Sequence, residues 1–178
     1  QHNGFKVIWL NTVNYDDAHD KRRVLGWFKF AFKINQLKKI IRTRPDTIIY
    51  SSPPLIPLIG ALVLKILTSA RLIFEIRDIW PLTLTEIGKV NNYHPFIVFS
   101  SIVERLGYRF ADVLVSNLQF AVDHIALKGG EKSKYHWIPN GVCLDELSNT
   151  MPCRSAFDIP SDKFIIGYSG SVGVANYL

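Results

Sequence analysis

Arg77 and Asp78 are the adjacent charged residues whose types and position suggest chemistry most directly. They follow an apolar run of strand length and stand just before Trp80. An arginine binds a phosphate or a carboxylate through two parallel hydrogen bonds, and a neighbouring aspartate accepts hydrogen bonds from hydroxyl groups or a proton from a nucleophile. The indole of Trp80 offers a flat face for a sugar. A structural alternative pairs Arg77 with Glu75 or Glu86 and places Trp80 in the core, since ion pairs at strand ends are common.

Small polar residues follow the other strand-like segments. In a parallel α/β sheet, ligands bind outside the carboxyl ends of the strands, so these residues are candidates for substrate binding. Strand ends need turns in any case, and Ser52 is also suited to cap the helix that follows it. The candidate substrate-binding residues, together with Trp80, are Ser51, Ser52, Ser116, Asn117, Asn140 and Gly141.

A glycine-rich turn follows the apolar residues 163–168. Glycines at such a turn let backbone amides approach a phosphate closely. The turn matches neither the six-residue dinucleotide-binding fingerprint nor the Walker pattern with its lysine, and a turn without a ligand is the structural alternative. The residues of the turn are Gly170, Ser171, Val172 and Gly173.

The segment from Lys21 to Arg44 holds nine basic residues and no acidic one, whereas the whole chain has a formal net charge of +6. A basic helix with aromatic residues beyond its core-facing stripe is typical of a membrane-surface helix. The alternatives are a surface helix covered by other parts of the protein, and nucleic-acid binding, which needs stacking aromatics along a charged groove; we favour the membrane over nucleic acid. The predicted stripe is Val24, Trp27, Ala31, Ile34, Leu37 and Ile41. The candidate membrane-surface residues are Lys21, Arg22, Arg23, Trp27, Phe28, Lys29, Phe32 and Lys33.

Apolar segments of strand length alternate with segments of helix length in this chain of 178 residues. Strands that are apolar on both faces and separated by helices are typical of a parallel α/β sheet. The sequence therefore predicts an α/β protein with a Rossmann-like parallel sheet and helices on both faces. The predicted strands are 5–10, 46–52, 71–76, 112–116 and 135–139. The predicted helices are 22–42, 55–68, 96–110 and 118–128.

The residues that would support several other functions are absent or unsuitably spaced. Cys143 and Cys153 have neither a CxxC spacing nor a histidine partner, which argues against a zinc site or a disulfide framework. The five histidines lack the spacing of a metal site or a catalytic triad, and no GxSxG motif occurs. The apolar segment 55–67 is shorter than the roughly 20 residues that cross a bilayer, so we expect a buried helix there.

The alternating pattern stops after residue 142. Residues 143–162 include Pro152 and Pro160 and are predicted to form a linker. A fresh strand is predicted at 163–168, so residues 163–178 read as the start of a second domain. Both ends of the sequence read as cut, which predicts a piece of a longer chain.

Five segments together resemble glycosyltransferase family 4, and within it the bacterial enzymes that build O-antigen and capsule saccharides. Their order and spacing match the family over nearly the whole chain, and the combination of RDIWP with IPNGV is the most specific feature. The segments are RPDTIIYSSPPL (44–55), FEIRDIWP (74–81), ADVLVSNLQFAVDHI (111–125), IPNGV (138–142) and IIGYSGSVG (165–173).

The resemblance implies a GT-B fold, in which two Rossmann-like domains face each other across a cleft. Residues 1–142 would form most of the acceptor-side domain, 143–162 the interdomain linker, and 163–178 the first strand and loop of the donor-binding domain. The implied reaction is the retaining transfer of a sugar from a nucleotide-sugar to an acceptor, without a metal ion or another cofactor. This part of the chain would be inactive alone, because the family's acidic donor-side pair would follow Leu178.

The resemblance also implies roles for individual residues. Arg77 occupies a position that is often histidine in other branches and that touches the transferred sugar. Because a guanidinium stays protonated, its implied catalytic role is to bind a phosphate or sugar hydroxyls, with Asp78 orienting the acceptor or pairing with Arg77. Residues 170–173 occupy the loop whose amides approach the diphosphate of the nucleotide-sugar. Ser171 stands where many members have arginine, and Cys143 stands where aspartate usually follows IPNGV.

Acceptors in this branch are commonly sugars on a polyprenyl diphosphate carrier in the cytoplasmic leaflet. The resemblance thus implies a cytoplasmic protein, peripheral on the inner face of the cell membrane, with an anionic membrane surface as partner and no nucleic acid. Two alternatives stay open. One is a sugar-nucleotide epimerase with the same GT-B shape, and the other is a non-catalytic module that binds membrane surfaces.

Overall fold

The structure is a computed structural model, and it describes residues 4, 6–16, 20–41, 43–145 and 162–170. The chain divides into two compact units, Gln1–Pro139 and Asn140–Leu178. All the helices and strands named below belong to the first unit.

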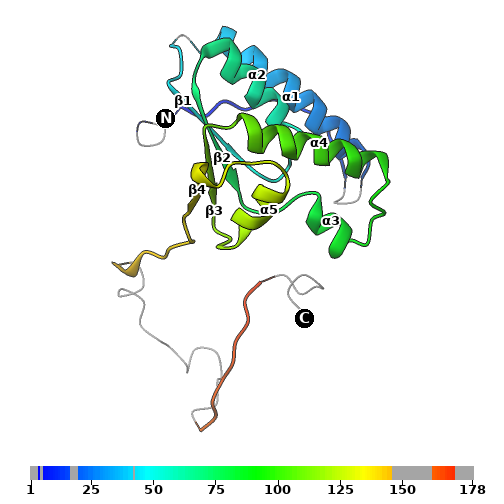
Figure 1. The fold of residues 1–178 in the computed structure, drawn as a ribbon. Helices are drawn as coiled ribbons and strands as arrows, with labels where there is room; N and C mark the ends of the chain where they lie inside the picture. The colour runs from blue at the N-terminus through cyan, green and yellow to red at the C-terminus, as the bar shows by residue number, and fades with distance from the viewer. Residues whose placement is uncertain (1–3, 5, 17–19, 42, 146–161, 171–178) are drawn as a thin grey trace. The chain divides into compact units, whose positions relative to one another are not determined.

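The first unit is built on a four-stranded sheet whose strands all run parallel, in the order β1-β2-β3-β4 (Figure 1). The prediction of an α/β protein with a parallel sheet is confirmed. The strands are β1 (Thr47–Ser51), β2 (Arg71–Ile76), β3 (Val113–Ser116) and β4 (Tyr135–Trp137). The helices are α1 (Arg22–Ile40), α2 (Leu58–Thr68), α3 (Leu82–Glu86), α4 (Pro95–Phe110), α5 (Ala121–Leu127) and the 3-10 helix η1 (Lys132–Lys134).

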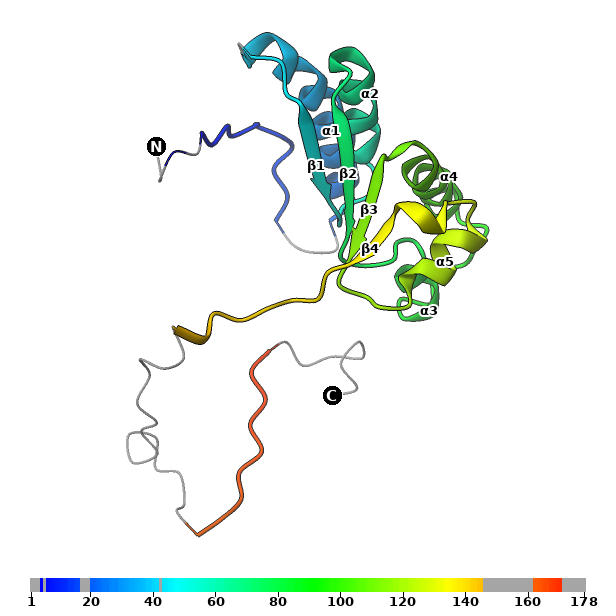
Figure 2. The same ribbon diagram turned by 60° about the vertical axis from the view of Figure 1, so that its left-hand side comes forward.

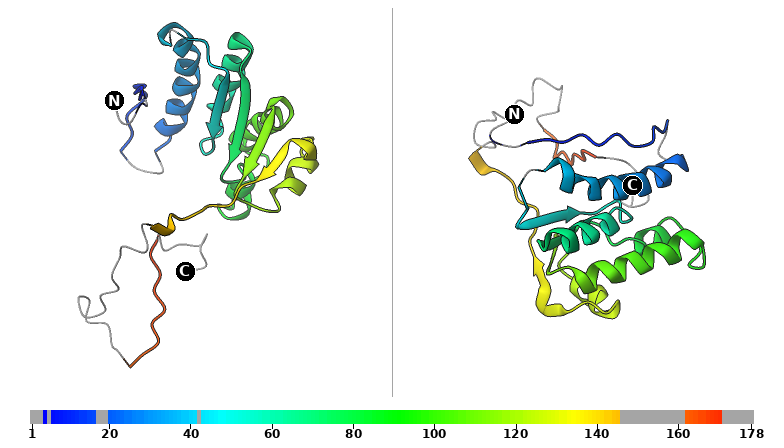
Figure 3. Two further views of the ribbon diagram at one scale, coloured as in Figure 1. Left: turned by 90° about the vertical axis from the view of Figure 1, so that its left-hand side faces the viewer. Right: turned by 90° about the horizontal axis from the view of Figure 1, so that it is seen from above.

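The described helices lie on one face of the sheet (Figures 2 and 3). Tyr50, Phe74 and Leu114 are neighbours in register and are buried beneath these helices, whereas Ile49 on the opposite face is 69% exposed. Successive parallel strands joined by right-handed crossovers place every connecting helix on the same side of a sheet. The prediction of helices on both faces is therefore met on one face only within the described part of the chain.

Helices α1, α2 and α4 form a layer in which α1 and α2 touch through their backbones. A Cβ atom at Gly60 in α2 would lie 2.4 Å from the carbonyl oxygen of Ala31 in α1, so glycine is required for this close approach. At its N-terminal end, α1 also reaches α4, where Phe28 and Phe99 have ring centroids 5.5 Å apart. The predicted core-facing stripe of α1 is confirmed, since all six of its residues are buried or half-buried.

Local chemistry sets the ends of two of these helices. His94 precedes α4, and its Nδ1 accepts a hydrogen bond from the Phe96 N–H at 3.2 Å, while Pro95 takes the first helical position. Both features are favoured at helix N-termini. Helix α2 ends at Ser69, which adopts the left-handed conformation with φ 53°, as helix C-termini often do.

Two predicted strands are wrong. Residues 6–10 of the first predicted strand and residues 163–168 of the other form no strand. An apolar segment becomes a strand only where a neighbouring strand pairs with it, and neither segment has such a neighbour within the described chain. Helices α3 and η1 were not predicted, since each is too short to show a periodic pattern. Of the predicted linker, residues 146–161 lie outside the described residues.

Candidate functional site

The carboxyl ends of β1, β2 and β3 bring together several of the predicted site residues. Ser51 ends β1, Arg77 and Asp78 follow β2, and Ser116 ends β3. The Arg77 N–H donates to Ser52 Oγ at 3.3 Å, which joins the residues following β1 and β2. Asn140 and Gly141 belong to the second unit, where both are exposed.

The side chain of Arg77 is exposed at this edge. It forms no hydrogen bond or ion pair within the described chain, and the structural alternative, a pair with Glu75 or Glu86, is not observed there. A guanidinium is always charged and has five N–H donors. Arg77 therefore presents donors that no group in this part of the protein uses.

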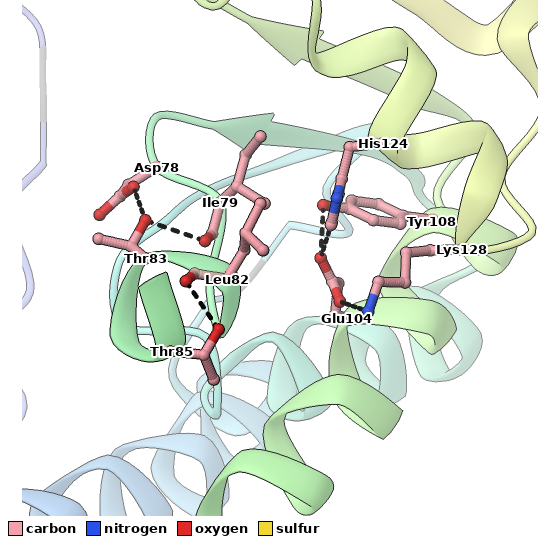
Figure 4. A network of polar contacts seen from close by, with 9 residues as sticks. All are labelled: Asp78, Ile79, Leu82, Thr83, Thr85, Glu104, Tyr108, His124 and Lys128. Carbon is pink, nitrogen blue, oxygen red and sulfur yellow. Dashed lines mark hydrogen bonds and ion pairs between the residues drawn. The ribbon is translucent and has the colours of Figure 1, made fainter. Parts of the chain in front are cut away.

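Asp78, in contrast, is held by its own loop (Figure 4). Its Oδ1 accepts from the Thr83 hydroxyl at 2.6 Å, and its Oδ2 accepts from Trp80 Nε1 at 3.2 Å. Thr83 belongs to α3, which the sequence did not reveal. No ion pair joins Asp78 to Arg77 in the described structure, so the carboxylate fixes the first turn of α3 and the indole beside it.

Trp80 contributes to a small aromatic hollow at the same edge. Its ring meets the ring of Trp27 in α1 edge-on, with centroids 5.7 Å apart. The hollow, of about 110 Å³, is lined by these two residues and by Arg23, Pro53 and Pro54. Arg23 places its guanidinium 5.6 Å from the Trp27 ring centroid. Sequence reasoning assigned Arg23 and Trp27 to a membrane surface, because it had no signal that α1 begins beside β2.

The hydroxyls of Ser52 and Ser116 are used inside the protein. Ser52 is 2% exposed and accepts from the Arg77 backbone, whereas Ser116 is fully buried. Ser116 Oγ donates to the Ile76 carbonyl at 2.6 Å and accepts from the Leu118 N–H at 3.1 Å. Both serines thus hold the backbone of the edge in place.

Ser51 and Asn117 remain available for a ligand at this edge. Ser51 is exposed. Asn117 is half-buried, and its Oδ1 is buried without a hydrogen-bond partner in the described chain. Its backbone carbonyl accepts from Trp137 Nε1 at 3.2 Å, which fixes the residue beside β4. A buried amide oxygen without a partner is unfavourable unless a ligand or water satisfies it.

A second polar cluster lies between α4 and α5, behind this edge (Figure 4). Glu104 is 1% exposed, and its Oε1 accepts from the Tyr108 hydroxyl at 3.1 Å and lies 2.6 Å from His124 Nε2. Its Oε2 lies 3.6 Å from Lys128 Nζ. Burial and the adjacent carboxylate raise the pKa of Tyr108, which keeps its hydroxyl protonated as a donor. The cluster joins α4 to α5 and so supports the loop that follows β3; its members are too far apart in sequence to be recognised as a group.

The predicted membrane-surface residues of α1 divide into two groups. Arg22 forms ion pairs with Asp16 and Asp20, and Arg23 and Trp27 line the aromatic hollow. The remaining residues are exposed or half-buried, with Phe28 44% exposed and Phe32 67% exposed. This second group consists of Lys21, Phe28, Lys29, Phe32 and Lys33.

Several other properties concern the described residues as a whole. They contain no group of three or more His, Cys, Asp or Glu side chains that could hold a metal ion. None of their helices has the combination of length and apolar character needed to cross a bilayer. On the donor side, Gly170 is exposed, and Ser171, Val172 and Gly173 lie outside the described residues.

Comparisons with known proteins identify a family and several similar structures. Residues 1–141 match the family model of a glycosyl transferase 4-like domain. The chain is similar to the crystal structure of Anabaena HepE in complex with UDP-glucose, with a TM-score of 0.45 and 16% sequence identity. That similarity covers 65% of this chain and 27% of the HepE chain. No curated protein sequence matches.

Proposed function

This chain belongs to the family of glycosyl transferase 4-like domains, and on that premise we propose that it forms the acceptor-side part of a retaining glycosyltransferase with a GT-B fold. The proposed enzyme moves a sugar from a nucleotide-sugar to a saccharide acceptor. The exposed guanidinium of Arg77, without a partner in the described chain, is the observation that carries the proposal. It stands at the carboxyl edge of a parallel sheet, where such sheets bind their ligands.

Arg77 has the chemistry that sugar transfer from a nucleotide-sugar requires. Departure of the nucleoside diphosphate develops negative charge on a phosphate oxygen, and a fixed cation stabilises that charge in the transition state. A guanidinium can hold two phosphate oxygens at once. In this proposal Asp78 is a positioning residue, because its two oxygens already accept from Thr83 and Trp80. Ser52 and Ser116 position the edge in the same way.

The neighbouring groups suit a saccharide. Aromatic rings such as Trp27 and Trp80 offer apolar faces to the C–H side of a sugar, and Arg23 lines the same hollow. Ser51 and Asn117 add hydrogen-bonding groups for its hydroxyls. We assign the acceptor to this side, together with the phosphate oxygen that leaves the transferred sugar, and the backbone amides of residues 170–173 remain the predicted further contacts of the donor diphosphate.

The acceptor we propose is a saccharide on a polyprenyl diphosphate carrier, used in O-antigen or capsule synthesis on the cytoplasmic face of the membrane. The resemblance of the five sequence segments supports this choice of acceptor. No metal ion takes part in this proposal.

Replacing Arg77 in the full-length protein tests the proposal. We expect Arg77→Ala to lower kcat/KM for sugar transfer by about 10²–10³-fold, the usual effect of removing one group that stabilises developing charge. Release of nucleoside diphosphate is measured with a panel of UDP- and GDP-sugars and lipid-linked saccharides.

Arg71→Ala is the matched control, because Arg71 is also exposed but begins β2 at the opposite edge of the sheet. It should retain normal transfer. Normal transfer by Arg77→Ala would contradict the proposal. Formation of an epimeric nucleotide-sugar without any acceptor would instead identify an epimerase.

A further inference from the structure

We propose that a hollow beside Asp78 binds the acetamido group of an N-acetylated saccharide. The hollow has a volume of about 220 Å³ and is lined by residues of α3 and by Leu118, which follows β3. We name it the α3 hollow. The inference rests on the proposed function, because it names the class of saccharide that the carboxyl edge of the sheet would accept.

Aliphatic side chains form most of the wall of the α3 hollow. They are Ile79, Leu82, Ile87 and Leu118. The last three are 39%, 43% and 38% exposed, respectively. Ile79 packs against the core of the first unit, and Figure 4 shows it beside Leu82 at the start of α3. Contact between this apolar surface and water is unfavourable, so a small apolar group of a ligand gains free energy by covering it.

The polar side chains of the α3 hollow offer hydrogen-bond acceptors. Glu86 is exposed and forms no hydrogen bond or ion pair within the described residues. The Thr83 hydroxyl has a single proton, which it donates to Asp78 Oδ1 at 2.6 Å or to the Ile79 carbonyl at 3.0 Å. A carboxylate binds a ligand that brings an N–H or O–H donor. The group that suits this hollow therefore combines a donor with an apolar part.

An acetamido group combines these two parts within a few atoms. Its N–H can donate to the Glu86 carboxylate while its methyl group contacts the aliphatic side chains, and its carbonyl oxygen stays outside the hollow in water. Other common substituents of saccharides supply only one part. A hydroxyl group donates but is not apolar, a 6-deoxy methyl group is apolar but has no donor, and an ammonium group is strongly hydrated.

The volume and charges of the α3 hollow fit a substituent of a sugar better than a lipid chain. Pockets that enclose a whole drug-sized ligand have about 300–1,000 Å³, so a hollow of about 220 Å³ suits one part of a ligand. A hydrocarbon chain lying there would remove the carboxylates of Asp78 and Glu86 from water without bringing a donor, which is costly.

The α3 hollow adjoins the edge to which we assign the acceptor. Asp78 directly follows Arg77, and Leu118 directly follows Asn117, whose buried Oδ1 has no hydrogen-bond partner in the described chain. A sugar that reaches Arg77 and Asn117 can therefore place one substituent in the hollow. That substituent would decide which saccharides bind, whereas Arg77 acts on the phosphate.

Saccharide binding by the full-length protein tests the inference. The probes are the methyl glycosides of N-acetylglucosamine and N-acetylgalactosamine, compared with methyl glucoside and methyl galactoside, which lack only the acetamido group. We expect the N-acetylated probes to bind about tenfold more tightly, the usual effect of a small group that fits an apolar pocket. Titration of tryptophan fluorescence gives the affinities. In saturation-transfer NMR, the acetyl methyl protons should receive the strongest saturation.

Changes in the α3 hollow should remove this preference. Glu86→Ala should weaken binding of the N-acetylated probes about tenfold, because it removes a hydrogen bond to a charged group. Leu82→Ala/Ile87→Ala should weaken it by about tenfold or more through lost apolar contact, and should leave binding of methyl glucoside nearly unchanged. Alanine is a good helix former, so α3 is retained.

Matched controls carry the same kinds of change elsewhere on the first unit. Asp46→Ala removes an exposed carboxylate at the amino edge of the sheet, and Ile49→Ala/Ile66→Ala shortens two aliphatic side chains that are 69% and 76% exposed. These controls should bind the N-acetylated probes as the unaltered protein does.

Equal affinity for N-acetylated and unsubstituted probes, tighter binding of methyl glycosides of 6-deoxy sugars, or equal losses in variants and controls would overturn the inference. Such results together with sugar transfer that depends on Arg77 would leave the proposed function standing. Loss of both the preference and the dependence of transfer on Arg77 would contradict both.

Discussion

The amino and carboxyl edges of the same four-stranded sheet differ in how their polar groups are satisfied. At the amino edge, Asp112 Oδ2 accepts from the Leu72 N–H at 2.7 Å, and its Oδ1 accepts from Lys65 Nζ at 2.8 Å. The Arg71 N–H donates to the Asp46 carbonyl at 2.8 Å. The polar groups of this edge thus tie the start of β2 to the elements on either side of it.

The carboxyl edge divides its polar groups between two tasks. Ser52, Asp78 and Ser116 accept or donate within the protein, as the amino-edge residues do. The Arg77 side chain and Asn117 Oδ1 have no hydrogen-bond partner in the described chain. Paired groups stabilise a fold, whereas unpaired ones at a ligand-binding edge are available for function.

The volumes of the hollows at the two edges do not follow the pairing of their polar groups. A hollow of about 490 Å³ lies at the amino edge of the sheet, beside the carboxyl-terminal ends of α1 and α2. The guanidinium of Arg44, which lines it, already donates to the Thr68 carbonyl. The aromatic hollow at the carboxyl edge has only about 110 Å³. The unpaired polar groups therefore favour the carboxyl edge as the candidate site, although its hollow is the smaller of the two.

The largest effect on stability is expected at the amino edge. Asp112→Ala removes the acceptor of the Leu72 N–H, whose residue is 0% exposed, and leaves Lys65 without its carboxylate. An unsatisfied buried donor lowers the free energy of unfolding by about 1–3 kcal/mol. Urea denaturation followed by tryptophan fluorescence measures the loss, and sugar transfer by the folded variant should be unchanged. If Asp112→Ala instead lost sugar transfer and kept its stability, the amino edge would have a functional role and the proposed difference between the two edges would be wrong.

Ser116→Ala should behave like an amino-edge change although it lies at the carboxyl edge. It removes a buried hydroxyl that both donates to Ile76 and accepts from Leu118, so we expect the free energy of unfolding to fall by about 1–2 kcal/mol. Ser51→Ala is the matched control. Because Ser51 is exposed, its change should stay within about 0.5 kcal/mol. Equal stability of both variants would show that the Ser116 hydroxyl does not hold the edge.

The sequence predicted the sheet well and the environment of the site only in part. Strand β2 was predicted with its observed bounds, because it is an apolar run of strand length whose end is marked by Arg77 and Asp78. The apolar segments 5–10 and 163–168 look equally strand-like by composition. Among the described residues they have no paired neighbour, whereas β2 pairs with both β1 and β3, and pairing depends on the tertiary structure.

Residue type alone could not separate ligand-facing groups from structural ones. A serine after a strand can present its hydroxyl to a ligand or to the backbone, and Ser52 and Ser116 do the latter. Asp78 is paired through Thr83, five residues later, in a short helix without a periodic pattern. The contact of Trp27 with Trp80 depends on where α1 starts relative to β2. Each of these outcomes follows from packing between elements that are separate in sequence.

The smallest expected effect is a pH dependence of stability that comes from Asp112 at the amino edge. Burial acts to raise the pKa of Asp112, but the hydrogen bonds from Lys65 and from the Leu72 N–H outweigh it and lower that pKa below its usual value. A carboxyl whose pKa is lowered on folding adds stability above its unfolded pKa of about 4, and this contribution is lost as the pH falls through the folded pKa.

Asp112→Asn keeps an oxygen for the Leu72 N–H but places an NH2 group opposite Lys65, so it removes both the charge and the acceptor that Lys65 uses. The difference in unfolding free energy between the unaltered protein and this variant should therefore be constant near neutral pH and shrink below about pH 4. Asp46→Asn matches the change in net charge, and its difference serves as the baseline at each pH. A difference that stays constant down to pH 3 would show that the charge of Asp112 does not contribute to the free energy of unfolding, and that its ion pair with Lys65 does not stabilise the amino edge.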